Sequence, residues 1–399
     1  MLKISFLGDI LCQMPFLKAA QQRGNNFYTT FSHLAPILKE SDFVVANLET
    51  PIAGEDAGYS KELYSFNTPA IFLDALKQLK IDLYLTANNH CLDRGIEGLK
   101  STVRELDKRQ MSHTGTISHP YHLAKLGDLT CAFLSYTACI NEDKWLKYKD
   151  ELSPDSINLL IDIDQYLAYR NEFRKKSIPL YELRKKLGNC ISQSFQLKLK
   201  EKLGIKLHPT TDNEPLEEVQ GTSFSQAESI IQKAKEDADL VFILPHCGGQ
   251  FNTKPGKLSQ AIFEKLLNTK ADAIIGGHPH TIQRCGALNN KPYIFSLGNV
   301  STSPSYPFLV KASLPEYGMI YHVYIDGKTI SKTSFSLIKM TEEPDHYPVI
   351  YPVDELYDTL EGNEKNKIIK DVNTICQRVF NCNSEFKVLK EYDLNIIYK

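Results

Sequence analysis

The chain has 399 residues, of which 42% are hydrophobic and 24% are charged, and its formal net charge is −2. This composition is typical of a soluble globular protein with one large or two medium domains, and the small net charge excludes a whole-molecule attraction to nucleic acid or to an anionic membrane. Nine cysteines without a CxxC pair predict reduced thiols rather than a disulfide framework.

The N-terminus, MLKISFLGD, is strand-like almost from its first residue. It has neither the basic start nor the long apolar stretch of a secretion signal, and no run in the chain reaches the length of a transmembrane helix. We therefore expect a cytoplasmic protein without a membrane anchor in this chain.

Apolar strands and amphipathic helices alternate along most of the chain, which predicts an α/β layered fold with strands buried on both faces. The expected strands span residues 2–8, 42–48, 81–86, 129–136, 239–245, 272–277 and 292–298. The expected helices lie near residues 32–40, 69–80, 95–109, 223–237 and 256–269. Two later runs, 318–327 and 328–340, alternate in hydrophobicity around Asp326-Gly327 and predict an antiparallel hairpin.

The alternation breaks between residues 142 and 222, which are charged, helical in pattern and poor in strand signals. This segment predicts a helical insertion in a main domain of residues 1–340, and the only tryptophan, Trp145, is expected to anchor it to the body. Residues 341–399 contain a Pro- and Tyr-rich stretch and a helical pattern near 363–380. We expect them to form a C-terminal extension that packs on the domain.

Residues 170–206 within the insertion are strongly basic, with eleven Lys and Arg against three Glu. Such a face can guide a polyanion such as polyglutamate, a phosphorylated glycan or nucleic acid, although solvated helix surface is the commoner use of this pattern. No aromatic-interleaved motif specific for RNA or DNA accompanies it.

Polar residues recur at the carboxyl ends of the expected strands, where open α/β sheets bind their ligands. These residues are Asp9, Asn47, Glu49, Asn88, Asn89, His90, His246, His278 and His280. Carboxylates, a carboxamide oxygen and neutral imidazoles together form a mixed shell suited to Mn, Fe or Zn. One carboxylate can bridge two ions, and a pair of ions about 3.5–4 Å apart generates a hydroxide nucleophile and clamps an in-line displacement at phosphorus.

Each of these signals also has a simpler interpretation. A strand-end Asp commonly caps a helix, a lone His is commonly structural, Asn88-Asn89 could form a turn, and GGHPH could be a glycine turn with incidental histidines. In GGHPH, however, the two glycines let the backbone approach closely and Pro279 stiffens the turn, so that the flanking histidines project to fixed positions. The occurrence of all the segments in this order, each behind a strand, favours one shared site.

The sequence resembles the CapA-type poly-γ-glutamate capsule synthesis family, a branch of the calcineurin-like metallophosphoesterase superfamily. The segments that carry the resemblance are FLGDIL, VVANLETP, FNTPAIFLDALKQLKIDLYLTANNHCLDRGIEGL, DLVFILPHCGG, ADAIIGGHPHTIQ and KPYIFSLGNVSTS. They cover about residues 1–140 and 222–305. The resemblance implies a four-layer αββα sandwich whose two central sheets present the site at one edge.

The resemblance also implies roles for individual residues. Asp9 and His280 would hold a first divalent ion, Glu49 would bridge, and a second ion would be held by Asn89, His246 and His278. His90 would donate a proton to the leaving group, and Asp93 would either orient His90 or cap the helix that begins near Gly95.

Two positions depart from the pattern of the superfamily and its relatives. Leu11 stands where the superfamily usually has a histidine, so the first ion would lose a ligand, and Gln250 stands where relatives usually have a carboxylate. Four cysteines lie beside the motif residues and are expected to pack as small apolar groups rather than to bind metal. They are Cys12, Cys91, Cys247 and Cys285.

We therefore expect a metal-dependent hydrolase with one or two ions of Mn, Zn or Fe. It would act on an anionic phosphoester through a metal-bound hydroxide in capsule or poly-γ-glutamate-type biosynthesis. The alternative is a non-catalytic accessory protein that uses the metal pocket to hold an anionic, polyglutamate-like chain.

Overall fold

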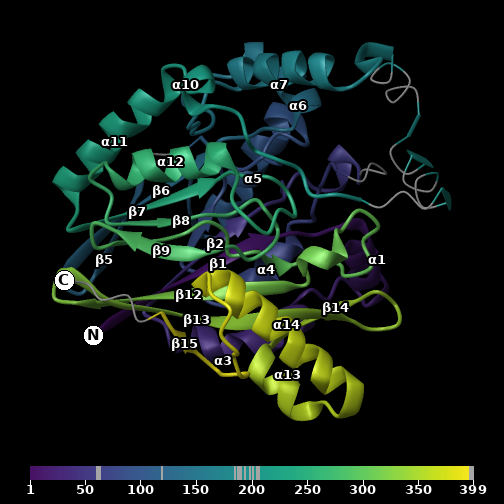
Figure 1. The fold of residues 1–399 in the computed structure, drawn as a ribbon, viewed down its shortest axis with the longest axis vertical. Coiled ribbons are helices and arrows are strands. Elements are labelled where there is room, and N and C mark those ends of the chain that lie inside the picture. The colour runs from purple at the N-terminus through teal and green to yellow at the C-terminus, as the bar shows by residue number, and fades with distance from the viewer. Residues whose placement is uncertain are drawn as a thin grey trace.

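Two β-sheets packed face to face form the centre of the computed structural model (Figure 1). The structure describes residues 1–59, 64–117, 120–183 and 207–394, with residues 186, 191, 192, 195, 196, 199, 202 and 203 between the last two ranges. Within these residues the chain is a mixed α/β protein, as the sequence predicts.

The first sheet contains four mutually parallel strands from the N-terminal part of the chain. Its strand order is β14 (Pro348–Pro352), β13 (Thr329–Glu342), β12 (Tyr317–Asp326), β1 (Leu2–Ile10), β2 (Phe43–Leu48), β3 (Leu83–Leu85) and β4 (Ser112–Thr114). In addition, β11 (Asn299–Ser301) pairs with β1, and β15 (Tyr392–Asp393) pairs with β13. Strands β1 to β4 are mutually parallel, so their carboxyl ends reach the same edge of the sheet.

The second sheet has the order β5 (His122–Leu126), β6 (Leu129–Thr137), β7 (Leu240–His246), β8 (Ala273–Ile275), β10 (Lys291–Ile294) and β9 (Cys285–Leu288). Strands β6, β7, β8 and β10 are parallel, whereas β5 and β9 run antiparallel to their neighbours at the two edges. This sheet therefore also gathers the carboxyl ends of its central strands at one edge.

Aromatic side chains join the two sheets. Phe6 from β1 lies 5.4 Å from Phe242 of β7, and Phe133 of β6 stacks on Phe242 at 5.2 Å and on Phe43 of β2 at 5.1 Å between ring centroids. Each ring is buried, and burial of an aromatic side chain of this size contributes about 1.5–3 kcal/mol. This shared core fixes how the edges of the two sheets meet.

Helices cover the outer face of each sheet. The first sheet packs against α1 (Met14–Gln22), α2 (Tyr28–Phe31), α3 (Ala35–Leu38) and α4 (Ile71–Gln78), and the second packs against α7 (Ile163–Ser177), α10 (Leu216–Val219), α11 (Ser223–Asp237) and α12 (Lys257–Leu267). In α12 the buried residues Leu258, Ile262 and Leu266 recur every four positions, which places them on one apolar stripe. Helix α5 (Gly95–Lys108) packs with both groups of helices: Leu106 belongs to the hydrophobic cluster outside the first sheet, and Leu99 belongs to the cluster outside the second.

The predicted strand 292–298 is wrong in its second half. Strand β10 ends at Ile294, and the chain then crosses to the first sheet, where β11 begins at Asn299. The crossing turns at Gly298, which has a φ of 72° that favours glycine. The predicted helix 32–40 is likewise divided into a 3₁₀ turn (Ser32–Leu34) and α3, with Pro36 in the first turn of α3.

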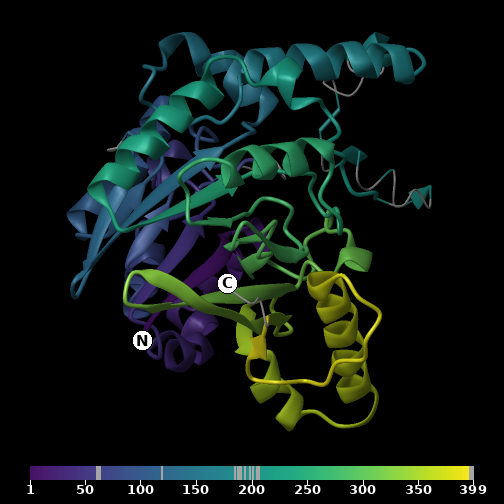
Figure 2. The same cartoon turned by 60° about the vertical axis from the view of Figure 1, so that its left-hand side comes forward.

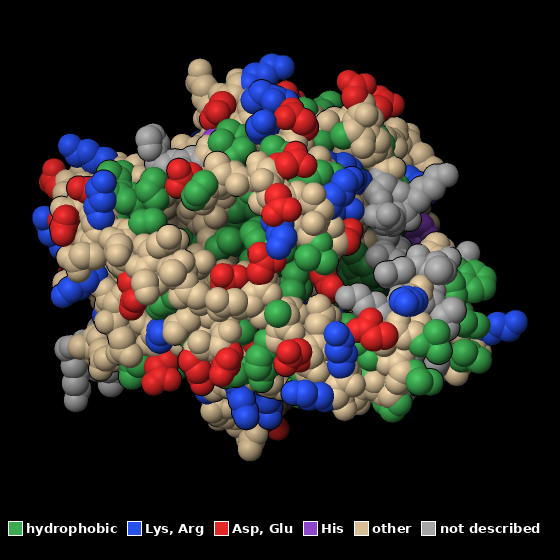
Figure 3. All heavy atoms as spheres, turned by 90° about the horizontal axis from the view of Figure 1, so that it is seen from above, with side chains coloured by type: hydrophobic (Ala, Val, Ile, Leu, Met, Phe, Trp, Pro, Cys, Tyr) green, Lys and Arg blue, Asp and Glu red, His purple; other side chains and the backbone are tan. Residues whose placement is uncertain are grey.

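The segment predicted as an insertion contains α6 (Glu142–Tyr148), a 3₁₀ turn (Lys149–Glu151), α7 and α10 in its described residues. Trp145 is half-buried against the outer cluster of the second sheet, and its Nε1 donates to Asp164 Oδ1 at 3.1 Å. Part of the basic stretch 170–206 lies outside the described residues. Acidic and basic side chains are interspersed on the face that Figure 3 shows.

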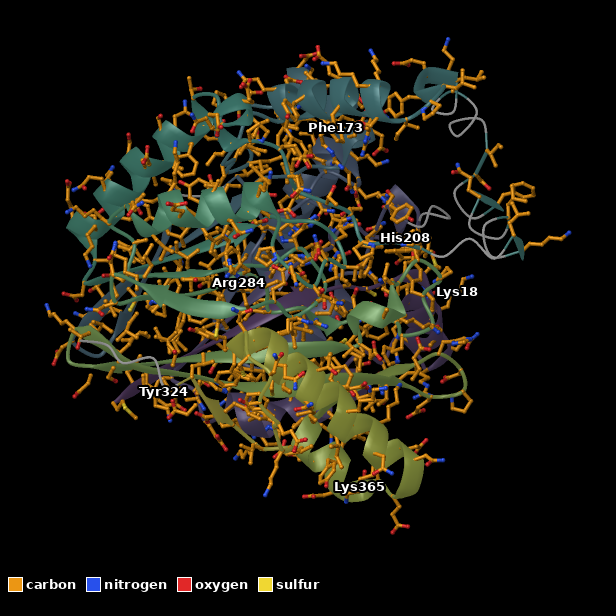
Figure 4. The ribbon with its side chains drawn as sticks, viewed as in Figure 1. Lys18, Phe173, His208, Arg284, Tyr324 and Lys365 are labelled. Carbon is orange, nitrogen blue, oxygen red and sulfur yellow. The ribbon has the colours of Figure 1, made fainter. Side chains whose placement is uncertain are left out.

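The C-terminal residues return to the core between the sheets. Helices α13 (Val353–Thr359) and α14 (Gly362–Phe380) lie at the opposite end of the molecule from α7 (Figures 1 and 2), as the labelled Lys365 and Phe173 also show (Figure 4). Helix α14 buries Ile368, Val372, Ile375 and Val379 in the central cluster, the hydrophobic core that lies between the two sheets. The predicted hairpin is confirmed, since β12 and β13 pair antiparallel around Gly327.

In the described part of the chain no helix combines the length and apolarity needed to cross a membrane. The division into a domain of residues 1–340 and an extension of 341–399 stays a prediction.

Candidate metal centre

The carboxyl end of β1 places Asp9 at the edge where the two sheets meet. The register between β1 and β2 shifts at Gly8, and a Cβ on Gly8 would lie 1.9 Å from the Gly298 carbonyl oxygen, so only glycine fits there. Such an irregularity re-aims the next side chain. Asp9 is fully buried and accepts hydrogen bonds from Asn47 Nδ2 at 2.7 Å and from the His278 backbone N–H at 3.2 Å.

Glu49, directly after β2, is a fully buried carboxylate, and neither of its oxygens has a hydrogen-bond partner among the residues that the structure describes. Its Oε1 lies 3.3 Å from His246 Nε2, 3.7 Å from His280 Nε2 and 4.0 Å from His90 Nε2. Burial, followed by the nearby charge of Asp9, raises the pKa of Glu49 to about 8. A buried carboxylate without partners is costly, and a cation would supply the missing interactions.

His246 ends β7, and the loop after β8 carries His278 and His280. Both loop histidines have positive φ, 98° and 53°, a backbone conformation that residues other than glycine adopt rarely. The loop reaches the site because Gly276 packs on the Phe295 carbonyl, where a Cβ would lie 2.2 Å from the oxygen. His278 Nδ1 consequently lies 3.1 Å from His246 Nε2.

The three imidazoles differ in the direction in which the site shifts their pKa. Burial lowers the pKa of His246 to about 4 and that of His278 well below its ordinary value, which keeps both rings in the neutral form that binds metals. Burial also opposes charge on His280, but Glu49 and Asp9 outweigh it and raise its pKa. For Asp9, burial acts to raise the pKa. The hydrogen bond and charge of His280 and the charge of His246 outweigh burial, so the pKa of Asp9 is lowered overall.

The structure brings together all six residues predicted as metal ligands. Asp9, Glu49 and His246 form one group of donor atoms within 4.8 Å of one another, and Glu49, His278 and His280 form another. Asn89 joins them, since its Oδ1 lies 2.8 Å from His246 Nε2. These oxygen and nitrogen donors could hold a divalent ion. Metal binding itself and the identity of the metal stay predictions.

His90 and Asp93 form a buried pair beside this cluster. His90 Nδ1 donates to Asp93 Oδ2 at 2.7 Å, and the ring stacks on Phe66 at 4.2 Å between centroids. The alternative that Asp93 caps the following helix is wrong, because α5 has Arg94 at its N-cap position and no side-chain cap. Asp93 instead accepts from the Phe66 N–H and from Asn141 Nδ2 as well as from His90. This geometry suits the alternative that Asp93 orients His90, which stays a prediction.

Sequence reasoning missed three residues at the site. Asn299 Oδ1 accepts from His280 Nδ1 at 3.0 Å, Asn141 contacts both His90 and Asn89, and Cys139 forms a third donor group with His246 and His278. Cys139 and Asn141 follow the carboxyl end of β6, so the same strand-end rule would have found them. Asn299 lies in the SLGN segment, which carries part of the family resemblance but implied no role for this residue.

The four cysteines expected to pack do lie in apolar surroundings. Cys12, Cys91 and Cys247 are buried members of the hydrophobic clusters, and the half-buried Cys285 packs against the central one. Burial raises the pKa of the Cys12 thiol to about 12.

A cavity of about 120 Å³ opens beside His90 and His280. Both positions that depart from the superfamily pattern, Leu11 and Gln250, line it, and Tyr64, Phe66, Phe251 and Phe308 form aromatic parts of its wall. The volume equals that of about four liquid water molecules, which is enough for a phosphate-sized group next to the donor cluster.

Fold and site together define an α/β protein of two packed sheets with a buried cluster of potential metal ligands. The family model described as "Bacterial capsule synthesis protein PGA_cap" matches residues 3–303, and the chain belongs to this family.

Two curated relatives carry CapA names. The chain is 22% identical over 306 residues to the PGA biosynthesis protein CapA of Bacillus subtilis and 22% identical over 305 residues to the capsule biosynthesis protein CapA of Bacillus anthracis, with 75% of this chain covered in each case. It spans about three fifths of their lengths, 62% and 59%. A crystal structure of a hypothetical protein from Thermus thermophilus is similar with a TM-score of 0.38 and 14% identity, covering 88% of this chain and 98% of that one.

Proposed function

We propose that this protein is a CapA-type metal-dependent phosphoesterase with a calcineurin-like four-layer sandwich, active in capsule or poly-γ-glutamate-type synthesis. The observation that carries the proposal is Glu49: in the described ranges its two buried oxygens have no hydrogen-bond partner, although three imidazole nitrogens lie within 4.0 Å of one of them. Such a carboxylate is poorly accommodated in a metal-free site and suited to bridging cations.

The donor set would suit one or two ions of Mn, Zn or Fe. Asp9 and His280 would hold the first, Asn89, His246 and His278 the second, and Glu49 would bridge them. Bound ions would supply Lewis acidity toward a phosphoryl oxygen and an activated water. Since Leu11 is buried at the cavity wall and offers no ligand, the first position would be the weaker of the two.

His90 is proposed as the proton donor to the leaving group. Its Nδ1 is held by Asp93, so its Nε2 is directed to the side of Glu49 and the cavity. Asp93 fixes the ring orientation, so that the imidazole is placed to deliver a proton to a departing oxygen. Stacking on Phe66 keeps the ring from rotating away.

Leu11 favours a second candidate function, a non-catalytic accessory protein that holds an anionic chain at the metal pocket. An ion with fewer protein ligands leaves more positions open for carboxylates of a polymer. In this case poly-γ-glutamate would bind without being cleaved, and binding would depend on Glu49.

The test starts with metal analysis of protein purified without added metal. Hydrolysis of bis(p-nitrophenyl) phosphate and p-nitrophenyl phosphate is then measured with Mn²⁺ or Zn²⁺. We expect His90→Gln to lower the rate by about 100-fold or more, the range of general acid catalysis. His113→Gln is the matched control, because His113 has its own carboxylate partner, Asp107 at 3.0 Å, but no place in the cluster. Absence of metal-dependent hydrolysis, or equal rates in both variants, would reject the phosphoesterase.

A further inference from the structure

We propose that Cys139 is a thiolate ligand of the ion held by His246 and His278, and that it makes this position select a thiophilic metal, Zn²⁺ or Fe²⁺, over Mn²⁺. The inference rests on the proposed metal centre and goes beyond it, because it assigns a sulfur donor and a metal preference. Cys139, His246 and His278 each offer one donor atom, and these atoms lie within 4.8 Å of one another.

The backbone ties Cys139 to His246. Thr137, the last residue of β6, stands opposite His246 in the parallel register with β7, and the Ala138 N–H donates to the His246 carbonyl at 3.0 Å. The Cys139 N–H in turn donates to Thr137 Oγ1 at 3.2 Å, and Thr137 Oγ1 donates to the Cys139 carbonyl at 2.7 Å. The thiol therefore has a defined position relative to the imidazole.

Cys139 differs from its neighbours in what it faces. Ala138 and Ile140 belong to the hydrophobic cluster outside the second sheet, whereas Cys139 does not. Within the described part of the chain its sulfur has two weak hydrogen-bond contacts, with the His246 carbonyl at 3.7 Å and with Thr137 Oγ1 at 3.8 Å. Neither contact is strong enough to keep the thiol from binding a metal, since S–H is a weak donor and sulfur is a weak acceptor.

A second observation points to a ligand at the same place. The buried Glu49 Oε1, which has no hydrogen-bond partner in the part of the chain that is described, lies 3.3 Å from His246 Nε2. Asn89 Oδ1 lies 2.8 Å from the same nitrogen. An ion here could take two nitrogens, oxygens and one sulfur. Thiolate ligands favour zinc and iron, whereas manganese prefers carboxylate, carbonyl and water. When the Cys139 thiol binds the ion, its proton is released to solvent.

Cobalt provides the test, because thiolate ligation of Co²⁺ produces a near-ultraviolet charge-transfer band that oxygen and nitrogen ligands do not. The full chain is stripped with a chelator, reloaded with Co²⁺, and compared with Cys139→Ser and Cys247→Ala. Cys247 is the matched control, since it follows His246 directly but lies in the hydrophobic cluster. Competition titrations then give the ratio of Zn²⁺ to Mn²⁺ affinity for each protein.

We expect the band in the wild type and in Cys247→Ala, its loss in Cys139→Ser, and a fall of the Zn²⁺ to Mn²⁺ affinity ratio by about 10–100-fold in Cys139→Ser. Cobalt binding without the band, or a band that survives in Cys139→Ser, would overturn the sulfur ligand and leave the metal centre standing. Failure of the wild type to bind Co²⁺, Zn²⁺ or Mn²⁺ would overturn the metal centre and the sulfur ligand together.

Discussion

Glu49→Gln should remove a pH dependence from the stability of the metal-free protein. Burial and the charge of Asp9 raise the pKa of Glu49 from its ordinary value of 4.5 to about 8. Between these pH values the folded chain keeps a proton on Glu49 that the unfolded chain has lost. The free energy of unfolding therefore falls as the pH rises through this window.

The size of the effect follows from the two pKa values. One pKa unit corresponds to about 1.4 kcal/mol, so the whole window corresponds to about 5 kcal/mol. Between pH 6 and pH 8 the expected loss is about 2 kcal/mol, because the folded state also begins to release the proton near pH 8. Glutamine keeps the shape of the side chain but does not titrate, and it should lack this loss.

The assay is urea denaturation in the presence of a chelator at pH 6 and pH 8. Glu97→Gln serves as the control, since Glu97 lies on α5 with an exposed side chain. We expect the wild type and Glu97→Gln to lose about 2 kcal/mol more than Glu49→Gln over this interval. Equal losses in all three proteins would show that Glu49 is not the buried proton acceptor that the structure describes.

Further predictions concern the packing around the site. Phe133→Ala should lower the free energy of unfolding, measured by urea denaturation, by about 3–5 kcal/mol, because the ring is fully buried between the sheets. A loss under about 1 kcal/mol would contradict that packing. Gly277→Ala places a Cβ 3.0 Å from Asp9 Oδ1 and should displace this carboxylate, so calorimetric titration should show weaker Mn²⁺ binding. An unchanged Mn²⁺ affinity would mean that Asp9 has room to move. Arg378→Met should cost about 2 kcal/mol in thermal denaturation, since this half-buried guanidinium on α14 donates to Thr281 Oγ1 and to the carbonyls of Ile282 and Ser313. An unchanged Tm would mean that these hydrogen bonds do not contribute to stability.

The strand ends were predictable because two independent patterns coincide there. Apolar runs mark the strands, and each polar residue stands directly behind one, as with Asp9 after ISFLG and His246 after VFILP. The parallel pairing then brings these ends together, which is a property of the topology and not of any local sequence. The convergence of Asp9, Glu49, Asn89 and the histidines was therefore foreseeable without coordinates.

Other features depend on contacts that the local sequence does not record. The run PYIFSLG reads as one strand, but tertiary packing moves its second half to the other sheet, where β11 pairs with β1. The role of Asp93 depends on Phe66 and Asn141, which approach from elsewhere in the chain. Cys139 was missed because it is flanked by the apolar residues Ala138 and Ile140, a pattern that predicts a cysteine buried in a hydrophobic core.

The donors of the centre come from both sheets: Asp9, Glu49 and Asn89 follow strands of the first, and His246 and His278 follow strands of the second. The Asp9 carboxylate and the His278 backbone that bonds to it are 269 residues apart. A chain emerging from the ribosome therefore cannot assemble the complete donor set until nearly all of the family-matched region has been synthesised and the sheets have docked. Under the proposed metal centre, cation loading would accordingly be a late maturation step. A translation product truncated before β7 would retain Asp9 and Glu49 without His246, His278 and His280.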